Sequence, residues 1–266
     1  MNPNCKKRMG AIRLENMKVM KQEEIAPAIF ELVLEGEMVE AMKAGQFLHL
    51  RVPDDAHLLR RPISISTIDK LKKQCHLIYR IEGSGTAIFS SLKPGDSLDV
   101  MGSQGNGFDL SGLNKDSKVL LVGGGIGVPP LLEVAKQLHE RGVEITTVLG
   151  FATKDAVILE DELAQYSQVF VTTDDGSYGT QGNVSVVINE CDTEFDAIYS
   201  CGAPGMMKYI NQTFYDHPRA YLSLESRMAC GMGACYACVL KVPDSETVSQ
   251  RVCEDGPVFK TGTVVL

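Results

Sequence analysis

The chain has 266 residues, of which 44% are hydrophobic and 23% are charged, as in ordinary globular proteins. Its formal net charge of −8 argues against nucleic acid as a partner, because no basic excess is available to neutralise phosphates. No apolar run approaches the roughly 18 residues of a membrane span, and the segment from Met1 to Met9 lacks the apolar stretch of a signal peptide. We therefore expect a cytoplasmic chain that works away from membranes, where its eight cysteines do not form disulfides.

Short β-rich runs separated by turn signals, such as Lys93-Pro94-Gly95-Asp96, make up the N-terminal part of the chain. Strands at this spacing are typical of a barrel or a sandwich. We expect an antiparallel β-barrel over residues 10–112. Its expected strands include Phe30–Leu34, Gln46–Val52, Ile63–Thr67, Cys75–Ile81 and Ser97–Met101.

The pattern changes near Ser117, after which expected strands and helices alternate. Leu131, Ala135 and Leu138 recur at helical spacing, and Gly142 stands where a helix C-terminal cap belongs. Alternation of this kind predicts a parallel α/β sheet, which we place at residues 113–222. Its expected strands are Lys118–Val122, Glu144–Leu149, Gln168–Thr173, Ala197–Ser200 and Ala220–Leu224.

The remaining segment, residues 223–266, is rich in cysteine and glycine and is too short for a hydrophobic core of its own. Four cysteines lie there in the pattern Cys230-x4-Cys235-x2-Cys238, followed later by Cys253. This spacing matches the C-x4-C-x2-C…C of plant-type [2Fe–2S] proteins. Glycines between the cysteines let backbone amides approach the cluster sulfurs. We therefore expect these four thiolates to be the metal ligands of a [2Fe–2S] cluster.

A structural zinc site is the main alternative, because Cys235-x2-Cys238 alone could supply two zinc ligands. Zinc sites of this kind usually pair two C-x2-C units, and no second unit surrounds Cys253. A chain with such a site would be a zinc-stabilised regulatory or binding module. Colour distinguishes the two, because zinc is colourless whereas FAD with [2Fe–2S] is brown-yellow.

A second constellation is Arg60-Arg61-Pro62-Ile63-Ser64 at the start of an expected strand. On its own the string could be an ordinary turn into a strand, but it resembles the R-x-[YFIS]-S motif of the ferredoxin-reductase superfamily. The resemblance implies bound FAD, with Arg61 at the flavin pyrophosphate, Ser64 near the isoalloxazine, and Pro62 and Ile63 in the same site. A guanidinium suits this role because its planar fork matches phosphate oxygens.

The next strand and loop supply further flavin contacts in that superfamily. Here Ile78-Tyr79-Arg80 lies in an expected strand, and Gly83-Ser84-Gly85-Thr86 follows it. The resemblance implies that Ile78, Tyr79 and Arg80 contact the flavin, and that the backbone of Gly85 and Thr86 contacts its phosphates. A plain hairpin turn followed by a helix start is the alternative for Gly85-Thr86.

A glycine-rich turn, Gly123-Gly124-Gly125-Ile126-Gly127, links an expected strand to a helix. It departs from the Rossmann G-x-G-x-x-G because Pro130 stands at the third glycine position. It resembles instead the G-G-x-G-x-x-P of ferredoxin-reductase nicotinamide domains. Glycines there allow a phosphate to reach the free amides of the helix N-terminus. We expect Gly123, Gly124, Gly125 and Gly127 to bind NAD.

Cys201-Gly202 follows the expected strand Ala197–Ser200, where the superfamily has a cysteine beside the nicotinamide ring. The resemblance makes Cys201 the candidate catalytic residue, and a buried thiol in a turn is the alternative. Asp174-Asp175-Gly176 closes another strand, so it should lie at the same carboxyl-end crevice, and a solvated turn is the alternative. NADP would need a basic residue near the adenosine ribose. Lys154 is the one candidate near the expected position, and no Ser-Arg string is present, so we expect NAD rather than NADP.

The order of barrel, α/β domain and cysteine-rich tail covers nearly the whole chain. Oxygenase reductases of the phthalate type share this order but have a longer ferredoxin domain. The tail, in which Leu224 to Cys235 reads LESRMACGMGAC, resembles the electron-transfer subunits of NAD-linked dihydroorotate dehydrogenases. That resemblance alone implies a role in pyrimidine biosynthesis. It also implies a partner catalytic subunit carrying FMN, in a heterotetramer with two copies of each subunit.

The three expected cofactors impose an order on electron flow. Nicotinamide accepts a hydride, which is two electrons together, whereas a [2Fe–2S] cluster carries one electron and a flavin handles both. The expected route therefore runs from the partner's FMN through the cluster and FAD to NAD⁺. A reductase that delivers NADH electrons to a different acceptor protein would carry the same motifs and is the alternative.

Overall fold

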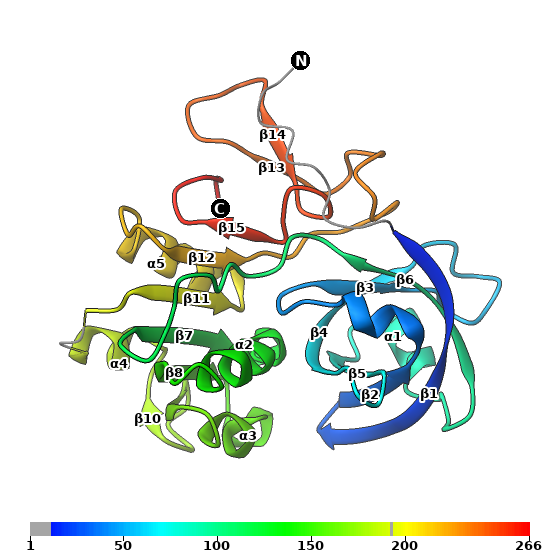
Figure 1. Ribbon diagram of the computed structural model, residues 1–266, viewed down its shortest axis with the longest axis horizontal. Coiled ribbons are helices and arrows are strands. Elements are labelled where there is room, and N and C mark those ends of the chain that lie inside the picture. The colour runs from blue at the N-terminus through cyan, green and yellow to red at the C-terminus, as the bar shows by residue number, and fades with distance from the viewer. Residues whose placement is uncertain (1–11, 192–193) are drawn as a thin grey trace.

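The computed structural model describes residues 12–191 and 194–266, which form a closed barrel, a seven-stranded sheet and a C-terminal tail (Figure 1). The barrel strands follow the order β1-β2-β5-β4-β3-β6, with antiparallel neighbours, so the predicted antiparallel barrel is confirmed. Its elements are β1 (Arg13–Ala26), β2 (Ile29–Glu35), η1 (Glu37–Ala41), β3 (Phe47–Leu50), β4 (Arg61–Asp69), β5 (Gln74–Arg80), α1 (Ser84–Phe89) and β6 (Ser97–Gln104).

The longest barrel strand, β1 with 14 residues, lies outside the strands expected from the sequence. Met17 and Val19 are its fully buried side chains, and most of the others face solvent. Its apolar alternation is therefore too short to signal a strand. The inward-facing side chains of the other strands fill the barrel, among them Leu32, Leu34, Leu48, Leu50, Ile65 and Leu77.

The sheet has the order β10-β9-β8-β7-β11-β12-β15, and its strands run parallel except for β15, which is antiparallel to β12. The predicted parallel α/β sheet is confirmed. Because β7 lies between β8 and β11, its glycine-rich carboxyl end is central in the sheet. The strands are β7 (Lys118–Gly124), β8 (Glu144–Phe151), β9 (Gln168–Thr173), β10 (Thr180–Gln181), β11 (Ala197–Cys201), β12 (Ala220–Ser223) and β15 (Val258–Lys260), and the connections contain η2 (Gly125–Gly127), α2 (Pro129–His139), η3 (Lys154–Ala156), α3 (Glu160–Ala164), α4 (Ser185–Glu190) and α5 (Pro204–Thr213).

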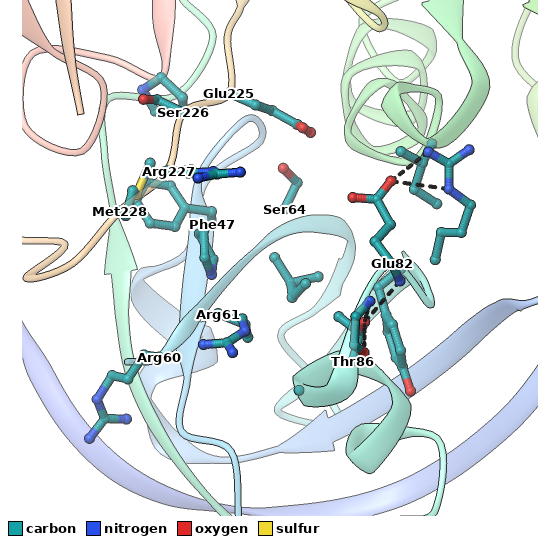
Figure 2. Close-up of a pocket in the computed structure, with 18 of the residues that line it drawn as sticks. Phe47, Arg60, Arg61, Ser64, Glu82, Thr86, Glu225, Ser226, Arg227 and Met228 are labelled. Carbon is teal, nitrogen blue, oxygen red and sulfur yellow. Dashed lines mark hydrogen bonds and ion pairs between the residues drawn. The ribbon is translucent and has the colours of Figure 1, made fainter. Parts of the chain in front are cut away.

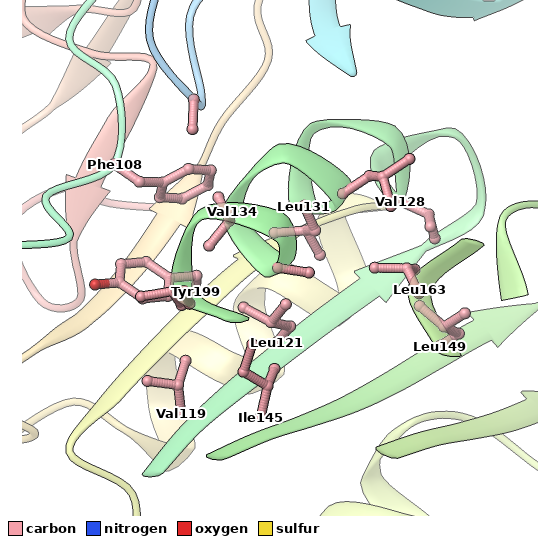
Figure 3. Packing of buried hydrophobic residues seen from close by; sticks show 14 of the residues in the cluster. Phe108, Val119, Leu121, Val128, Leu131, Val134, Ile145, Leu149, Leu163 and Tyr199 are labelled. Atoms are coloured by element: carbon pink, nitrogen blue, oxygen red, sulfur yellow. The ribbon is translucent and has the colours of Figure 1, made fainter. Parts of the chain in front are cut away.

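Helix α2 lies between the sheet and the barrel (Figure 1). Its apolar residues, including Leu131 and Val134, pack over Leu121 of β7 (Figure 3). Gly142 follows the last turn with φ +75°, as the sequence predicts for a residue that ends a helix. With 11 residues, α2 is the longest helix in the described ranges, and none of the helices there is long and apolar enough to cross a membrane.

The tail shares the core of the sheet. Its two short strands β13 (Val239–Lys241) and β14 (Ser249–Arg251) form a hairpin, and β15 extends the sheet beyond β12. Val252 and Phe259 of the tail are buried in one apolar group with Leu222 of β12. A segment too short for its own core thus completes the core of its neighbour.

The turn after Cys253 is also fixed to the barrel. Just beyond β6, the backbone N–H of Asn106 donates to the carbonyl of Gly256 at 2.6 Å. The side-chain amide of Asn106 donates to the carbonyl of Asp255 at 3.1 Å. The tail is therefore held by the barrel on one side and by the sheet on the other.

Candidate functional site

A cavity of about 750 Å³ lies where the barrel, the sheet and the tail meet (Figure 2). Residues from β4, β5 and the start of α1 line it, because β4 and β5 are antiparallel neighbours and α1 follows β5 directly. Every flavin-site residue expected from the sequence is brought together here. These residues are Arg61, Pro62, Ile63, Ser64, Ile78, Tyr79, Arg80, Gly85 and Thr86.

The Arg61 guanidinium passes directly over Gly85. A Cβ atom on Gly85 would come within 2.7 Å of Arg61 Nε, so a larger residue there would force the guanidinium to shift. Arg61 Nη1 donates to the carbonyl of Leu59 at 2.6 Å, which holds the guanidinium at the cavity wall. A guanidinium has five N–H donors in a planar fork, so the side chain keeps donors for an anionic group.

Side-chain hydrogen bonds hold the loop that leads into α1. Thr86 Oγ1 accepts the N–H of Glu82 at 3.0 Å and the N–H of Gly83 at 3.3 Å. Ser84 Oγ lies 2.7 Å from Nε2 of His57, a residue in the connection between β3 and β4. The loop is therefore fixed both internally and against a neighbouring connection, which suits a site that presents its backbone to a ligand.

The lining residues fit FAD. The cavity volume lies within the roughly 300–1,000 Å³ of small-molecule sites. Phe47, Ile63 and Ile78 provide apolar surface, and Arg61 and Arg227 provide guanidinium groups. Apolar surface suits the flavin ring system, whereas guanidinium groups suit a pyrophosphate.

The glycine-rich turn after β7 packs against the turn after β11. A Cβ atom on Gly127 would come within 2.5 Å of Gly202 Cα, and one on Gly124 would come within 2.8 Å of Met206 Sδ. At Gly127 and Gly202 the two backbones approach this closely because neither residue has a side chain. Ile126 of this turn lines the flavin cavity, whereas the predicted NAD residues Gly123, Gly124, Gly125 and Gly127 do not.

Cys201 lies at the carboxyl end of β11, level with Gly123 of β7 and Ser223 of β12. Its side chain is 2% exposed and does not line the flavin cavity, although Ser223 does. Burial, together with the charge of Glu225, raises the pKa of the Cys201 thiol to about 12. Cys201 is therefore a neutral thiol at physiological pH, suited to packing beside a ring and poorly suited to nucleophilic attack.

The Asp174-Asp175-Gly176 turn lies at the carboxyl end of β9, as expected. The N–H of Asp174 donates to the carbonyl of Phe151 at 3.0 Å, and that of Asp175 donates to the carbonyl of Ala152 at 3.3 Å. The turn therefore packs against the end of β8, on the same edge of the sheet as the glycine-rich turn.

The four cluster cysteines come together as two pairs. Cys238 Sγ and Cys253 Sγ are 3.3 Å apart and buried. Cys230 and Cys235 form the other pair, in which the N–H of Cys235 donates to Cys230 Sγ at 3.4 Å. In the described part of the chain, no three histidine, cysteine or carboxylate side chains are grouped to hold one metal ion. Two pairs of thiols match the ligands of a two-iron cluster, in which each iron takes two.

Backbone amides point at the sulfur atoms of these cysteines. The N–H of Met232 donates to Cys230 Sγ at 3.4 Å, and the N–H of Gly233 donates to Cys253 Sγ at 3.1 Å. Partial burial opposes ionisation of Cys230, but the N–H groups of Met232 and Cys235 outweigh it and lower the pKa of the Cys230 thiol to about 7. The loop thus stabilises negative charge on Cys230 Sγ, whereas burial and the adjacent Cys238 raise the pKa of the Cys253 thiol to about 12.

The segment between β12 and the first cluster cysteine also lines the cavity, and its residues are additions to the flavin-site residues expected from the sequence. Glu225, Arg227 and Met228 belong to it, and Figure 2 shows Glu225 above Ser64 and Arg227 beside it. Burial raises the pKa of Glu225. The sequence signal for these residues is the string LESRM just before the cysteine motif, which is part of the tail's resemblance to the electron-transfer subunits.

Three family models match successive parts of the chain. An oxidoreductase FAD-binding domain matches residues 16–108, and an oxidoreductase NAD-binding domain matches residues 121–212. The iron–sulfur cluster binding domain of dihydroorotate dehydrogenase B matches residues 225–265. The expected cofactors, namely FAD, NAD and an iron–sulfur cluster, are confirmed by these domains, as is their order along the chain.

The chain is 86% identical over 255 residues to the dihydroorotate dehydrogenase B (NAD(+)) electron transfer subunit of Streptococcus pneumoniae strain R6, covering 96% of this chain and all of that protein. The corresponding subunit of Streptococcus mutans is 64% identical over 253 residues, or 95% of this chain and 98% of that protein. A solved NADH-dependent reduced ferredoxin-NADP oxidoreductase is 30% identical with a TM-score of 0.83, covering 94% of this chain and 90% of that one. An Amycolatopsis cytochrome P450 reductase shares the fold. It is 19% identical with a TM-score of 0.68, covering 79% of this chain and 69% of that one.

These similarities extend over the barrel, the sheet and the tail alike, and the cluster-domain match includes all four clustered cysteines. The chain is an oxidoreductase component, and a subunit of this name implies a partner catalytic subunit. The chain belongs to the family of dihydroorotate dehydrogenase B (NAD(+)) electron transfer subunits.

Proposed function

We propose that this chain carries electrons from the FMN of a partner dihydroorotate dehydrogenase catalytic subunit, through a [2Fe–2S] cluster and FAD, to NAD⁺ in pyrimidine biosynthesis. The observation that carries the proposal is the cavity wall formed by residues 223–228, because this segment leads directly to Cys230. Ile126 borders the same cavity from the nicotinamide side. The proposed domains are 10–112 for FAD, 113–222 for NAD and 223–266 for the cluster, with β15 of the last completing the sheet of the second.

In this proposal the barrel residues hold the flavin in position and supply positive charge to its phosphates. Arg61 binds the pyrophosphate, and the backbone of Gly85 and Thr86 contacts the phosphates. Ser64 lies near the isoalloxazine. The remaining lining residues of β4 and β5, namely Pro62, Ile63, Ile78, Tyr79 and Arg80, form the surrounding wall. Bound FAD supplies the one chemistry that cluster and nicotinamide lack, which is exchange of both single electrons and hydride.

The nicotinamide side is built on the carboxyl ends of β7 and β11. The glycines Gly123, Gly124, Gly125 and Gly127 bring the phosphates of NAD to the N-terminus of α2, where free amides favour an anion. The neutral Cys201 thiol packs beside the nicotinamide ring. NAD is proposed in preference to NADP, because NADP would need basic residues near the adenosine ribose and Lys154 is the one candidate there.

The partner is proposed to dock on the tail. Cys235 is exposed, and the neighbouring Met232 and Tyr236 are 42% and 59% exposed. Methionine and aromatic residues are enriched in protein interfaces. We propose a catalytic subunit that carries FMN, in a complex with two copies of each subunit. The assembly would work in the cytoplasm, where the cysteines stay reduced.

The test is to measure NADH formation from dihydroorotate and NAD⁺ with each subunit alone and with both together. The pair should yield orotate and NADH, whereas the partner alone should reduce its own FMN without reducing NAD⁺. A pair assembled with a Cys238→Ser chain, which lacks one cluster ligand, should yield almost no NADH. If this chain alone oxidised dihydroorotate, or if the native pair gave no NADH, a reductase serving a different acceptor protein would replace the proposal.

A further inference from the structure

The outer face of β3 is covered by the cysteine-rich tail. Leu48 and Leu50 point into the barrel core, so the side chains that alternate with them, Phe47 and His49, point outward. Phe47 nevertheless is buried, in the same apolar group as Cys253. The outer side of this barrel strand is therefore part of the surface on which the cluster cysteines rest.

His49 lies directly beneath the cluster loop. Its side chain is fully buried, and a Cβ atom on Gly231 would collide with His49 Nδ1. Gln104, at the end of β6 and 2% exposed, approaches the same point, with Oε1 2.9 Å from that Cβ position. Because Gly231 follows Cys230 in the chain, these two barrel side chains reach the cluster site from the barrel side.

Both side chains have hydrogen-bonding atoms without a protein partner. Within residues 12–191 and 194–266, neither ring nitrogen of His49 is hydrogen-bonded, and Gln104 Oε1 receives no donor. The Gln104 amide nitrogen does donate, to the carbonyl of Met101 at 3.4 Å. Polar atoms that are buried in native proteins are almost always hydrogen-bonded. A hydrogen-bond acceptor near Gly231 would pair with the N–H of the His49 ring, whereas Gln104 Oε1 needs a donor.

The backbone of His49 is held firmly on both sides. It pairs with Pro62 of β4 and with Met101 of β6. Its carbonyl oxygen also accepts a hydrogen bond from Arg60 Nη1 at 3.4 Å. A side chain mounted on a central barrel strand is placed more precisely than one on a loop. The imidazole is therefore positioned by the barrel independently of the cysteine loop.

We propose that His49, supported by Gln104, donates a hydrogen bond to the iron–sulfur centre held by Cys230 and the other cluster cysteines, and that it thereby raises the reduction potential of this centre. An imidazole carries an N–H in either protonation state. A donor aimed at sulfur stabilises the extra negative charge of the reduced cluster. The inference deepens the proposed function and rests on its [2Fe–2S] assignment.

The experiment uses the full chain, purified anaerobically, as the native protein and as His49→Leu, His49→Gln and Gln104→Leu. His76→Gln is the matched control, because His76 lies on β5 of the same barrel and pairs with Glu31 at 2.7 Å. Iron and sulfide are quantified, and the cluster potential is measured by redox titration followed by electron paramagnetic resonance. Chains with ¹⁵N-labelled histidine are examined by pulsed electron paramagnetic resonance of the reduced cluster, which detects coupling to a histidine nitrogen.

We expect His49→Leu to retain its iron and to shift the ratio of oxidised to reduced cluster about tenfold at a given potential. For a one-electron cluster, this tenfold change corresponds to a reduction potential about 59 mV more negative than that of the native chain. His49→Gln, which keeps a donor, and Gln104→Leu should show smaller shifts, and His76→Gln none. The native chain and His76→Gln should show a histidine nitrogen coupled to the cluster, and His49→Leu should lack it.

An unchanged potential in His49→Leu, or a native cluster without histidine coupling, would overturn the inference and leave the [2Fe–2S] assignment intact. The labelling measurement on the native chain and on His49→Gln, which should lose the coupling, decides the question even where His49→Leu does not fold. Absence of iron and sulfide from the native chain would instead overturn the cluster assignment, and the role of His49 with it.

Discussion

Glu133 of α2 accepts a hydrogen bond from the backbone N–H of Ile68 in β4, with 2.9 Å between Oε2 and the nitrogen. Its Oε1 accepts from the side-chain amide of Gln137 at 2.8 Å, and the carboxylate is almost fully buried. β4 carries Arg61 and Ser64, and α2 begins after the glycine-rich turn. This contact therefore links the strand of the flavin site to the helix of the nicotinamide site.

Glu133→Ala should lower the free energy of unfolding by about 1–3 kcal/mol, because the Ile68 N–H loses its acceptor inside the interface. Glu133→Gln keeps an acceptor of nearly the same shape, so its free energy of unfolding should fall by less. Urea unfolding of the FAD-loaded chain measures both. Equal losses in the two variants would show that the hydrogen bond is not what stabilises this contact.

Glu133 also predicts a dependence of stability on pH. Burial raises its pKa above the ordinary value of 4.5. A raised pKa means that the folded chain favours the protonated carboxyl, so this contribution is complete below pH 4.5 and is lost as the pH rises through the folded-state pKa. The native chain should therefore lose stability relative to Glu133→Gln across that window. Unfolding measured at a series of pH values tests this, and a constant difference would contradict it.

Arg61→Ala should weaken FAD binding about 10- to 100-fold, because a hydrogen bond to a charged group contributes roughly 1.5–3 kcal/mol. Gly85→Ala should have a similar effect. Its new Cβ atom would lie only 2.7 Å from Arg61 Nε and would therefore displace the guanidinium. Arg51→Ala is the control, because Arg51 is exposed and lies outside the cavity lining. FAD retention is measured by fluorescence of released flavin, and normal retention in Arg61→Ala would remove this residue from the site.

The purified chain should contain about two irons and two acid-labile sulfides, bound by Cys230, Cys235, Cys238 and Cys253. Cys238→Ser should lose the cluster and its absorbance above the flavin bands. Cys191→Ser, which changes a thiol outside this group, should keep both. Metal and sulfide analysis gives the result, and one zinc without iron in the native chain would make the site structural.

Cys201→Ala should retain FAD and slow hydride exchange with NAD about tenfold or more, because small misplacements of a reacting ring are costly. The high pKa of the Cys201 thiol, about 12, predicts that iodoacetamide at pH 8 leaves it unmodified in the folded chain. Stopped-flow reduction of the flavin by NADH and mass spectrometry of the alkylated chain test the two statements. Rapid alkylation of Cys201 would contradict its burial.

Tyr236→Asp should weaken assembly with the catalytic subunit at least tenfold while leaving the iron content unchanged, because Tyr236 is 59% exposed beside the exposed Cys235. Leu71→Asp is the control, since Leu71 is 99% exposed in the turn between β4 and β5. Analytical ultracentrifugation of the mixed subunits measures assembly. Equal weakening by both substitutions would argue against a tail interface.

Local patterns in the sequence determined the order of the three parts and most of their strands. The strand Gln168–Thr173 was predicted with the bounds that the structure has. The flavin string beginning at Arg61 and the spacing from Cys230 to Cys253 also predicted residues that the fold brings together. Strand runs, glycine turns and cysteine spacings depend on neighbours along the chain, and so they can be read without a structure.

Tertiary structure alone decided which distant segments meet. β15 pairs with β12, Glu225 and Arg227 line the flavin cavity, and His49 of the barrel lies beneath Gly231 of the tail. None of these contacts has a local signal, because each depends on how two already formed surfaces pack against each other. β1 lacks a local signal for the same reason: its two inward side chains gain their significance only when the barrel closes around them.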